Sequence, residues 1–287
     1  MRRLAVAGVA LLALTPAAAC AEPPIWTVRD HDSEMVLFGS LHVLKPGARW
    51  MTPQLTRALE RADDIWFELP VDPGTELEAA RLAAQRGTLP PGQTLTTLLK
   101  PDTQARLLRV AESYGVALPL IDRLEPWLAE VVLGSAIFRK AGASVDSGVE
   151  KSLNQAAPPV TQRHAFETPA EQIGVFADTS RAEQIASLEE TLRSMEERPE
   201  EYESLVDAWM DGDVRRLDHE ALDPLREATP GVYRSLVVQR NTRWLARLRV
   251  RMAGSGRTVV VVGVGHLVGP DGLPTRLRAL GYSVEGP

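Results

Sequence analysis

Four consecutive valines, Val259–Val262, form the most hydrophobic strand predicted in this chain, and they lead directly into Gly263, Gly265 and His266. A short apolar run of this kind is typical of a strand buried on both faces of a parallel sheet. A second apolar stretch, EMVLFGSLHVL at residues 34–44, lies near the other end of the chain and also passes through a glycine to a histidine. We therefore expect one sheet whose strands come from both ends of the sequence.

The segments between these strands predict an α/β fold. A polar turn, DHDSE, joins the strand at 34–44 to an earlier strand, IWTVRD, at 25–30. Residues 51–64 then predict a helix that Thr52 caps, and DIWFELP at 64–70 predicts the next strand. This strand–helix–strand order is typical of parallel sheets. We expect a central, mainly parallel or mixed sheet within a single domain over residues 22–287. Further strands are predicted at 158–167 and 282–285, and mostly helical insertions at 75–150 and 180–255.

The first 21 residues, MRRLAVAGVALLALTPAAACA, have the layout of a secretory signal peptide. They predict export to the periplasm or the extracellular space, with cleavage after Ala21. A lipoprotein signal, with Cys20 lipidated and the protein attached to a membrane, is the alternative. Cys20 is the only cysteine, so cleavage after Ala21 would leave no disulfide and no thiol chemistry. The net charge of −6, without a long basic run, argues against nucleic acid as a partner.

Polar residues follow the predicted strands at the positions where parallel sheets bind ligands. His42 and His266 each close a Gly-x-x-His motif, beginning at Gly39 and Gly263 respectively. Two glutamates come at the ends of the other strands: Glu68 in the strand at 64–70 and Glu167 in the strand at 158–167. Two imidazoles and a carboxylate form a ligand set for a divalent metal, and a second carboxylate can act as a base. Gly39, Gly263 and Gly265 allow the backbone to turn sharply or approach a neighbour closely.

Other polar residues are weaker candidates. Arg240 and Asn241 lie in a predicted helix, where the arginine could hold a substrate carboxylate or an oxyanion, or form a structural salt bridge. Asp146 and Glu150 share one helix face, and we interpret them as a capping or solvated pair. The remaining histidines are predicted to be solvent-facing or packing residues; these are His31, His164 and His219.

The same segments resemble the TraB/GumN family, of the bacterial GumN type. The resemblance rests on LFGSLHVLKP, DIWFELP, HAFETPAEQI, QRNTRWLARL and the final segment from Val259 to Val284. This family is similar to the Tiki metalloproteases of animals, and more distantly to haem-binding ChaN-like and erythromycin-esterase-like proteins. By motif, the resemblance implies His42 and His266 as metal ligands, with manganese or cobalt favoured over zinc. It implies site roles for four further residues: Glu68, Glu167, Arg240 and Asn241. The segment ASVD departs from the Gly-Val-Asp of many members, which weakens a role for Asp146.

Four functions stay open at this point. The first is a secreted metal-dependent hydrolase of the peptidase type, acting on a peptide or a small molecule. The second is an exported protein that binds a metal or haem without catalysis. The third is a metal-free, esterase-like hydrolase in which a histidine hydrogen-bonded to a glutamate acts as the base. The fourth is a non-catalytic factor linked to export, in which the polar residues would be scattered.

Overall fold

The computed structural model describes residues 22–287, so the predicted signal peptide at 1–21 and Cys20 lie outside the described residues. Its centre is a six-stranded sheet with strand order β4-β3-β5-β2-β1-β6. β2, β5, β3 and β4 are parallel, whereas β1 runs antiparallel to both of its neighbours. The mixed, mainly parallel sheet with strands from both ends of the sequence is therefore confirmed. The strands are β1 (Ile25–Arg29), β2 (Ser33–Ser40), β3 (Asp64–Phe67), β4 (Gln162–Ala165), β5 (Gly256–Gly263) and β6 (Ser283–Glu285).

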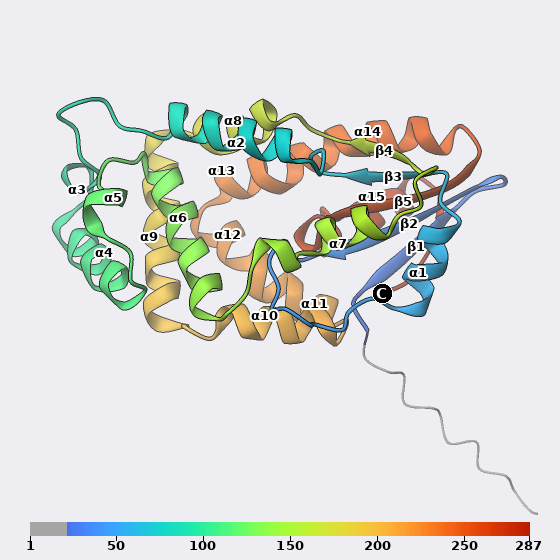
Figure 1. The fold of residues 1–287 in the computed structure, drawn as a ribbon, viewed down its shortest axis with the longest axis horizontal. Helices are drawn as coiled ribbons and strands as arrows, with labels where there is room; N and C mark the ends of the chain where they lie inside the picture. Colours follow the sequence, from blue (N-terminus) through green and yellow to red (C-terminus); the bar gives the residue numbers. More distant parts are fainter. Residues whose placement is uncertain (1–21) are drawn as a thin grey trace, which may run out of the picture.

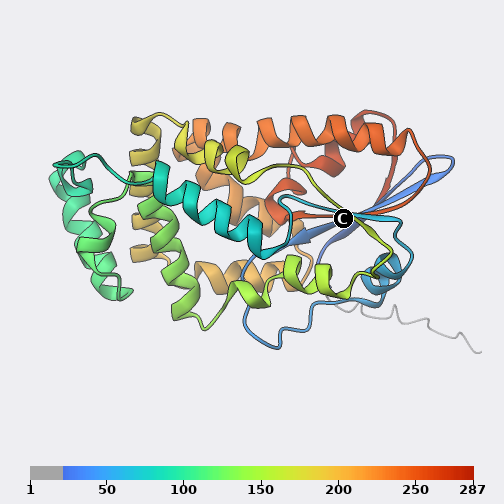
Figure 2. The same cartoon turned by 45° about the horizontal axis from the view of Figure 1, so that its top comes forward.

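The valine run forms the middle of the sheet. Val259–Val262 belong to β5, which pairs with β2 on one side and β3 on the other, and each valine is at most 1% exposed. Figure 2 shows α14 (Arg240–Met252) on one side of the sheet and α1 (Pro53–Glu60) on the other. Burial on both faces explains why β5 reads as a continuous apolar run and not as an alternating one.

Apart from β4, the chain between β3 and β5 is mainly helical. Figure 1 shows many of these helices grouped beside the sheet, with α4 far from it. Within this part, a second hydrophobic cluster includes Leu107, Leu133, Leu188 and Leu192, which are all fully buried. The helices before β4 are α2 (Pro73–Arg86), α3 (Leu95–Leu98), α4 (Pro101–Ser113), α5 (Leu118–Ile121), α6 (Pro126–Lys140), the 3-10 helix η1 (Val145–Ser147) and α7 (Val149–Ala156). After β4 come α8 (Pro169–Ala177), α9 (Arg181–Glu197), α10 (Glu201–Met210), α11 (Val214–Leu217), the π-helix η2 (Asp218–Leu222), α12 (Asp223–Ala228), α13 (Pro230–Tyr233) and the π-helix η3 (Arg234–Gln239).

Local sequence signals set several helix boundaries. Thr52 caps α1 by accepting a hydrogen bond from the Leu55 backbone, and Pro53 occupies the first turn. Thr168 and Glu171 form the capping box that starts α8. After β5, the 3-10 helix η4 (Val264–His266) leads to α15 (Leu273–Ala279).

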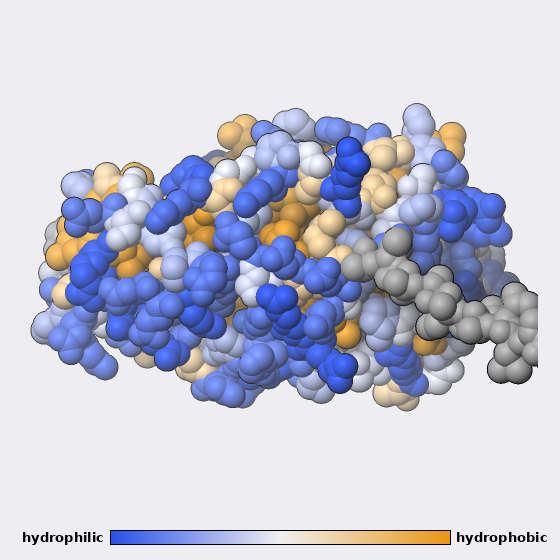
Figure 3. Space-filling view, turned by 90° about the horizontal axis from the view of Figure 1, so that it is seen from below, coloured by the Kyte–Doolittle hydropathy of each residue, from blue (hydrophilic) through white to orange (hydrophobic). Residues whose placement is uncertain are grey.

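Hydrophilic residues cover most of the face shown in Figure 3, with hydrophobic residues in small patches between them. Within residues 22–287, no helix is both long and apolar enough to cross a membrane.

Candidate functional site

The carboxyl ends of four parallel strands bring four of the predicted residues to one edge of the sheet. Glu167 follows β4, Glu68 follows β3, His266 follows β5 and His42 follows β2. The strands lie in this same order across the sheet, so each polar residue has the next one as its neighbour. A hydrogen bond links the ends of β5 and β3 at this edge: the backbone N–H of Gly263 donates to Glu68 Oε1 at 2.7 Å.

Arg240 lies at the centre of this group. Its Nη2 donates to Glu68 Oε2 at 2.6 Å and to Glu167 Oε2 at 2.7 Å, and its Nε donates to Glu167 Oε1 at 2.9 Å. The three side chains are at most 7% exposed. Glu167 also accepts a hydrogen bond from Trp244 Nε1 at 3.1 Å, so its oxygens are used within the protein. The structural salt bridge is therefore the arrangement found for Arg240.

The charge of Arg240 controls the ionisation of Glu68. Burial alone would raise the pKa of the Glu68 carboxyl, but the Arg240 guanidinium and the two nearby histidines hold that pKa well below its usual range. Burial opposes the charge of Arg240 as well, yet the two glutamates raise the pKa of its guanidinium above the ordinary value. Glu68 is consequently a carboxylate at neutral pH despite its burial.

Asn241 fixes the tautomer of His266. Asn241 Nδ2 donates to two backbone carbonyls, those of His266 at 3.1 Å and Asp271 at 2.9 Å. Its Oδ1 must therefore be the acceptor in the 2.8 Å contact with His266 Nδ1, which places the proton on Nδ1. His266 Nε2 then carries a lone pair, and Arg240 Nη1 donates to it at 3.1 Å. Burial, with the charge of Arg240, lowers the pKa of His266 to about 3, so the ring is neutral.

A π-helical segment directly precedes two consecutive buried residues, Arg240 and Asn241. Both belong to α14, where adjacent residues are about 100° apart, and an inward-facing stripe of that width accommodates both. Here the π-helix η3 ends directly before Arg240, and both Arg240 (5% exposed) and Asn241 (0%) are buried. Such π segments are frequent at functional sites because they shift the register of the residues that follow.

Glu150 is the site residue that sequence reasoning missed. The capping-or-solvated interpretation of Glu150 was wrong, because its carboxylate is 17% exposed and Oε1 lies 2.7 Å from His42 Nδ1. Ser40 Oγ donates to the same oxygen at 2.5 Å. Gly148 makes this contact possible, since a Cβ there would lie 2.3 Å from the His42 carbonyl oxygen. Asp146, in contrast, is exposed and pairs with Lys151.

The two histidines differ in charge. The charge of the Glu150 carboxylate and its hydrogen bond raise the pKa of His42 to about 9. His42 is therefore protonated at neutral pH, whereas His266 is neutral. The His42 side chain is 60% exposed, so it has room to move that the buried His266 lacks.

Two cavities open onto this edge of the sheet, and His42 and Glu68 line both. One has a volume of about 370 Å³ and is also lined by Arg240, His266 and apolar side chains of the helical part. The other, about 260 Å³, lies on the side of α2 and α7. Gly263 stands between the polar groups: a Cβ at this position would lie 3.2 Å from Glu68 Oε1 and 3.4 Å from His42 Nε2. Glu167 and Asn241 line neither cavity.

The predicted metal ligands meet only part of the geometry that one ion needs. His266 Nε2 and Glu68 Oε1 are 3.9 Å apart, which two ligands of one ion at about 2.1 Å each can span. His42 is farther away, so the ligand atoms of His42, Glu68 and His266 do not all lie within 4.8 Å of one another. Among residues 22–287, the only group of three possible metal ligands that are this close is the exposed triplet of the β1–β2 turn: Asp30, His31 and Asp32. Binding of one ion by His42, Glu68 and His266 requires the exposed His42 ring to approach and Arg240 to yield its contact with His266.

The other residues singled out in the sequence either form packing contacts or lie at the surface. A Cβ at Gly39 would lie 2.8 Å from Val264, so this glycine lets β2 pack closely against the turn after β5. A Cβ at Gly265 would lie 3.3 Å from Leu222, a tight contact with the helical part. His164 stacks on Trp66, with 4.7 Å between ring centroids, while His31 and His219 are exposed.

The chain belongs to the TraB/PrgY/gumN family, whose model matches residues 24–286. It is similar to the uncharacterized protein YbaP of Escherichia coli (strain K12), with 25% identity over 249 residues, which cover 84% of this chain and 87% of YbaP. The YbaP protein of Shigella flexneri matches with the same identity and coverage. No solved structure matches the chain significantly. The family membership expected from the motifs is thus confirmed.

Proposed function

We propose that this protein is a hydrolase of the peptidase type in which His42, Glu68 and His266 hold one divalent metal ion. The observation that carries the proposal is the state of the two imidazoles. Each has Nδ1 bound to a side-chain acceptor, Glu150 or Asn241, which leaves Nε2 on the side of Glu68; binding of the ion would release the proton from His42 Nε2 and displace the Arg240 contact from His266 Nε2. Metal-ligating histidines are oriented by such partners. When bound, the ion would lower the pKa of a water molecule and polarise a substrate carbonyl, and the family resemblance favours manganese or cobalt over zinc.

The protein's own residues would prepare this site in three ways. Arg240 keeps Glu68 ionised in a buried position, and Asn241 keeps the His266 lone pair on Nε2. The apolar wall of the larger cavity, which includes Val206 and Leu236, would hold apolar groups of a peptide or a small molecule beside these polar atoms.

A second candidate is metal-free hydrolysis, favoured by the 2.7 Å contact between His42 and Glu150. A neutral histidine that is hydrogen-bonded to a carboxylate can accept a proton from water, because the carboxylate stabilises the imidazolium that forms. Since the pKa of His42 is about 9, this reaction would be favoured at alkaline pH. In this reaction His266 would contribute only packing and hydrogen bonding.

Calorimetric titration of metal-free protein with manganese, cobalt and zinc would test the first proposal, together with a peptide-library cleavage assay. We expect one bound ion, with affinity reduced at least about ten-fold in His42→Ala and in His266→Ala. His219→Ala is the control, because His219 is exposed and lies outside the site. Cleavage without metal that needs His42 but not His266 would favour the second candidate. A parent protein that neither binds an ion nor cleaves any substrate would contradict both.

A further inference from the structure

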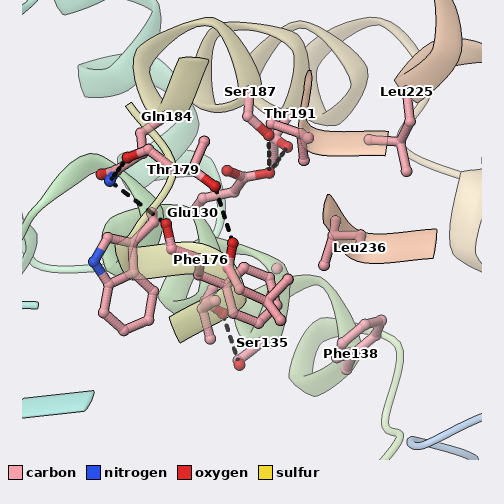
Figure 4. Close-up of a pocket in the computed structure, with 15 residues that line it drawn as sticks. Glu130, Ser135, Phe138, Phe176, Thr179, Gln184, Ser187, Thr191, Leu225 and Leu236 are labelled. Atoms are coloured by element: carbon pink, nitrogen blue, oxygen red, sulfur yellow. Dashed lines mark hydrogen bonds between the residues drawn. The ribbon is translucent and has the colours of Figure 1, made fainter. Parts of the chain in front are cut away.

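A separate cavity of about 340 Å³ lies in the helical part, between α6, α8 and α9 (Figure 4). Its volume is in the range of small-molecule pockets. Most of its wall is apolar or aromatic, from Trp127, Val131, Phe138, Val175, Phe176 and Leu236. This cavity is lined by different polar residues from those at the sheet edge, although Phe138, Leu225 and Leu236 line both the 340 Å³ and the 370 Å³ cavity.

One carboxylate, Glu130, stands in this apolar wall. Its Oε1 accepts hydrogen bonds from Ser187 Oγ at 2.9 Å and from Thr191 Oγ1 at 2.8 Å, and Figure 4 shows the three side chains together. Among the described residues, none donates a hydrogen bond to Oε2 and no basic side chain forms an ion pair with Glu130. The fixed Oε1 orients the carboxylate and leaves Oε2 for a ligand.

Apart from the indole N–H of Trp127, for which the described residues offer no acceptor, the other polar side chains of the wall use their donors within the protein. Ser135 Oγ and Thr179 Oγ1 each donate, at 2.9 Å, to a carbonyl one turn earlier in their helices. Gln184 Nε2 donates to the carbonyls of Thr179 at 2.8 Å and Phe176 at 3.5 Å, and Gln184 Oε1 is buried without a hydrogen-bond partner. Glu130 Oε2 is therefore the carboxylate acceptor that the wall offers to a ligand.

We propose that this cavity binds an organic ammonium ion, a protonated primary amine carried on an apolar body, with the ammonium group against Glu130 Oε2. An ammonium group brings donors to the unpaired Glu130 Oε2, and its charge compensates the buried carboxylate. The rings of Trp127, Phe138 and Phe176 suit the apolar body and the cation alike. Burial raises the pKa of Glu130, which is the behaviour expected of a carboxylate that lacks its cation. The proposal does not depend on the hydrolase proposal.

Calorimetry with 2-phenylethylamine and its neutral analogue 2-phenylethanol, at neutral pH, would test this site. We expect the amine to bind at least about ten-fold more tightly than the alcohol, because only the amine forms a charge-assisted hydrogen bond. Glu130→Gln should abolish this preference and leave the affinity for the alcohol unchanged. Glu197→Gln is the control, since it removes the same charge from an exposed position on α9.

A second variant tests whether the ligand binds inside the cavity. Gly134 lies on α6 and lines the cavity, and a Cβ there would meet no atom within 4 Å. Gly134→Leu should therefore fill the space, keep the fold and prevent binding of both compounds. Equal affinities for amine and alcohol, no binding of the amine, or undiminished binding to Glu130→Gln or to Gly134→Leu would each overturn the proposal.

Discussion

Replacing Arg240 with methionine would test whether a single cation holds the candidate site together. Methionine has a similar length and can fill the buried space, but it removes the charge that faces Glu68 and Glu167. These two carboxylates would then stay in the interior without their cation. His266 would also lose a hydrogen-bond donor at Nε2.

The structure sets the size of the expected effect. Removing one partner of a buried ion pair costs about 3–5 kcal/mol, since the remaining charge is left uncompensated. For a chain of this size, 1 kcal/mol changes the melting temperature by about 2–4 °C. We therefore expect Arg240→Met to melt about 6–20 °C below the parent at neutral pH. Arg243→Met is the matched control, because that side chain is 53% exposed and contacts Glu167 at 3.4 Å, so its loss should cost no more than about 1 kcal/mol.

The pH dependence makes the test specific to charge. In the parent, Glu68 has a lowered pKa, so its ion pair contributes stability above the unfolded value near 4.3 and loses that contribution as the pH falls through the folded value. In the variant, burial without the cation raises the pKa of Glu68, so protonation on acidification relieves the uncompensated charge. The difference in free energy of unfolding should therefore shrink between about pH 7 and about pH 4.5. A loss below about 1 kcal/mol, or an equal loss at both pH values, would refute this reasoning.

Three further predictions concern neighbouring contacts. Glu150→Gln should lower the pKa of His42 from about 9 toward its ordinary value in metal-free protein; an unchanged NMR titration of the ring protons would contradict the role given to the carboxylate. Asn241→Leu should cost about 1–3 kcal/mol in urea unfolding, because His266 Nδ1 and two backbone carbonyls lose their partner. Thr168→Ala should cost about 1 kcal/mol by removing the cap of α8; an unchanged urea midpoint would show that the capping box does not stabilise this helix.

The strand ends were the most predictable part of this protein. Apolar runs bounded by glycine and polar residues define β2, β3 and β5, and a parallel arrangement then places His42, Glu68 and His266 at one edge. Only the strand pattern and the general position of ligand sites in α/β sheets were needed. The sequence pattern therefore predicted which residues lie at this edge of the sheet, although it did not predict their contacts or distances.

The partners of these residues depend on tertiary contacts that no local pattern encodes. Glu150 reaches His42 because Gly148 permits a close backbone approach between α7 and the end of β2. A π-helix directly precedes the buried pair Arg240 and Asn241, and the helical pattern of the sequence did not predict it. A glycine within a Ser-Gly-Val turn was the available signal for the first contact, but it does not identify which residue lies opposite.

The pairing of β2 with β5 has a consequence for folding kinetics. These two strands occupy the middle of the sheet, yet one ends at Ser40 and the other begins at Gly256. Closing a loop of this length is entropically costly, and domains dominated by such distant pairings fold slowly. During synthesis, the helical segments can collapse while β2 still lacks its central neighbour. A chain interrupted before Gly256 therefore exposes an unpaired apolar strand, and it is expected to be a target for chaperones or for aggregation.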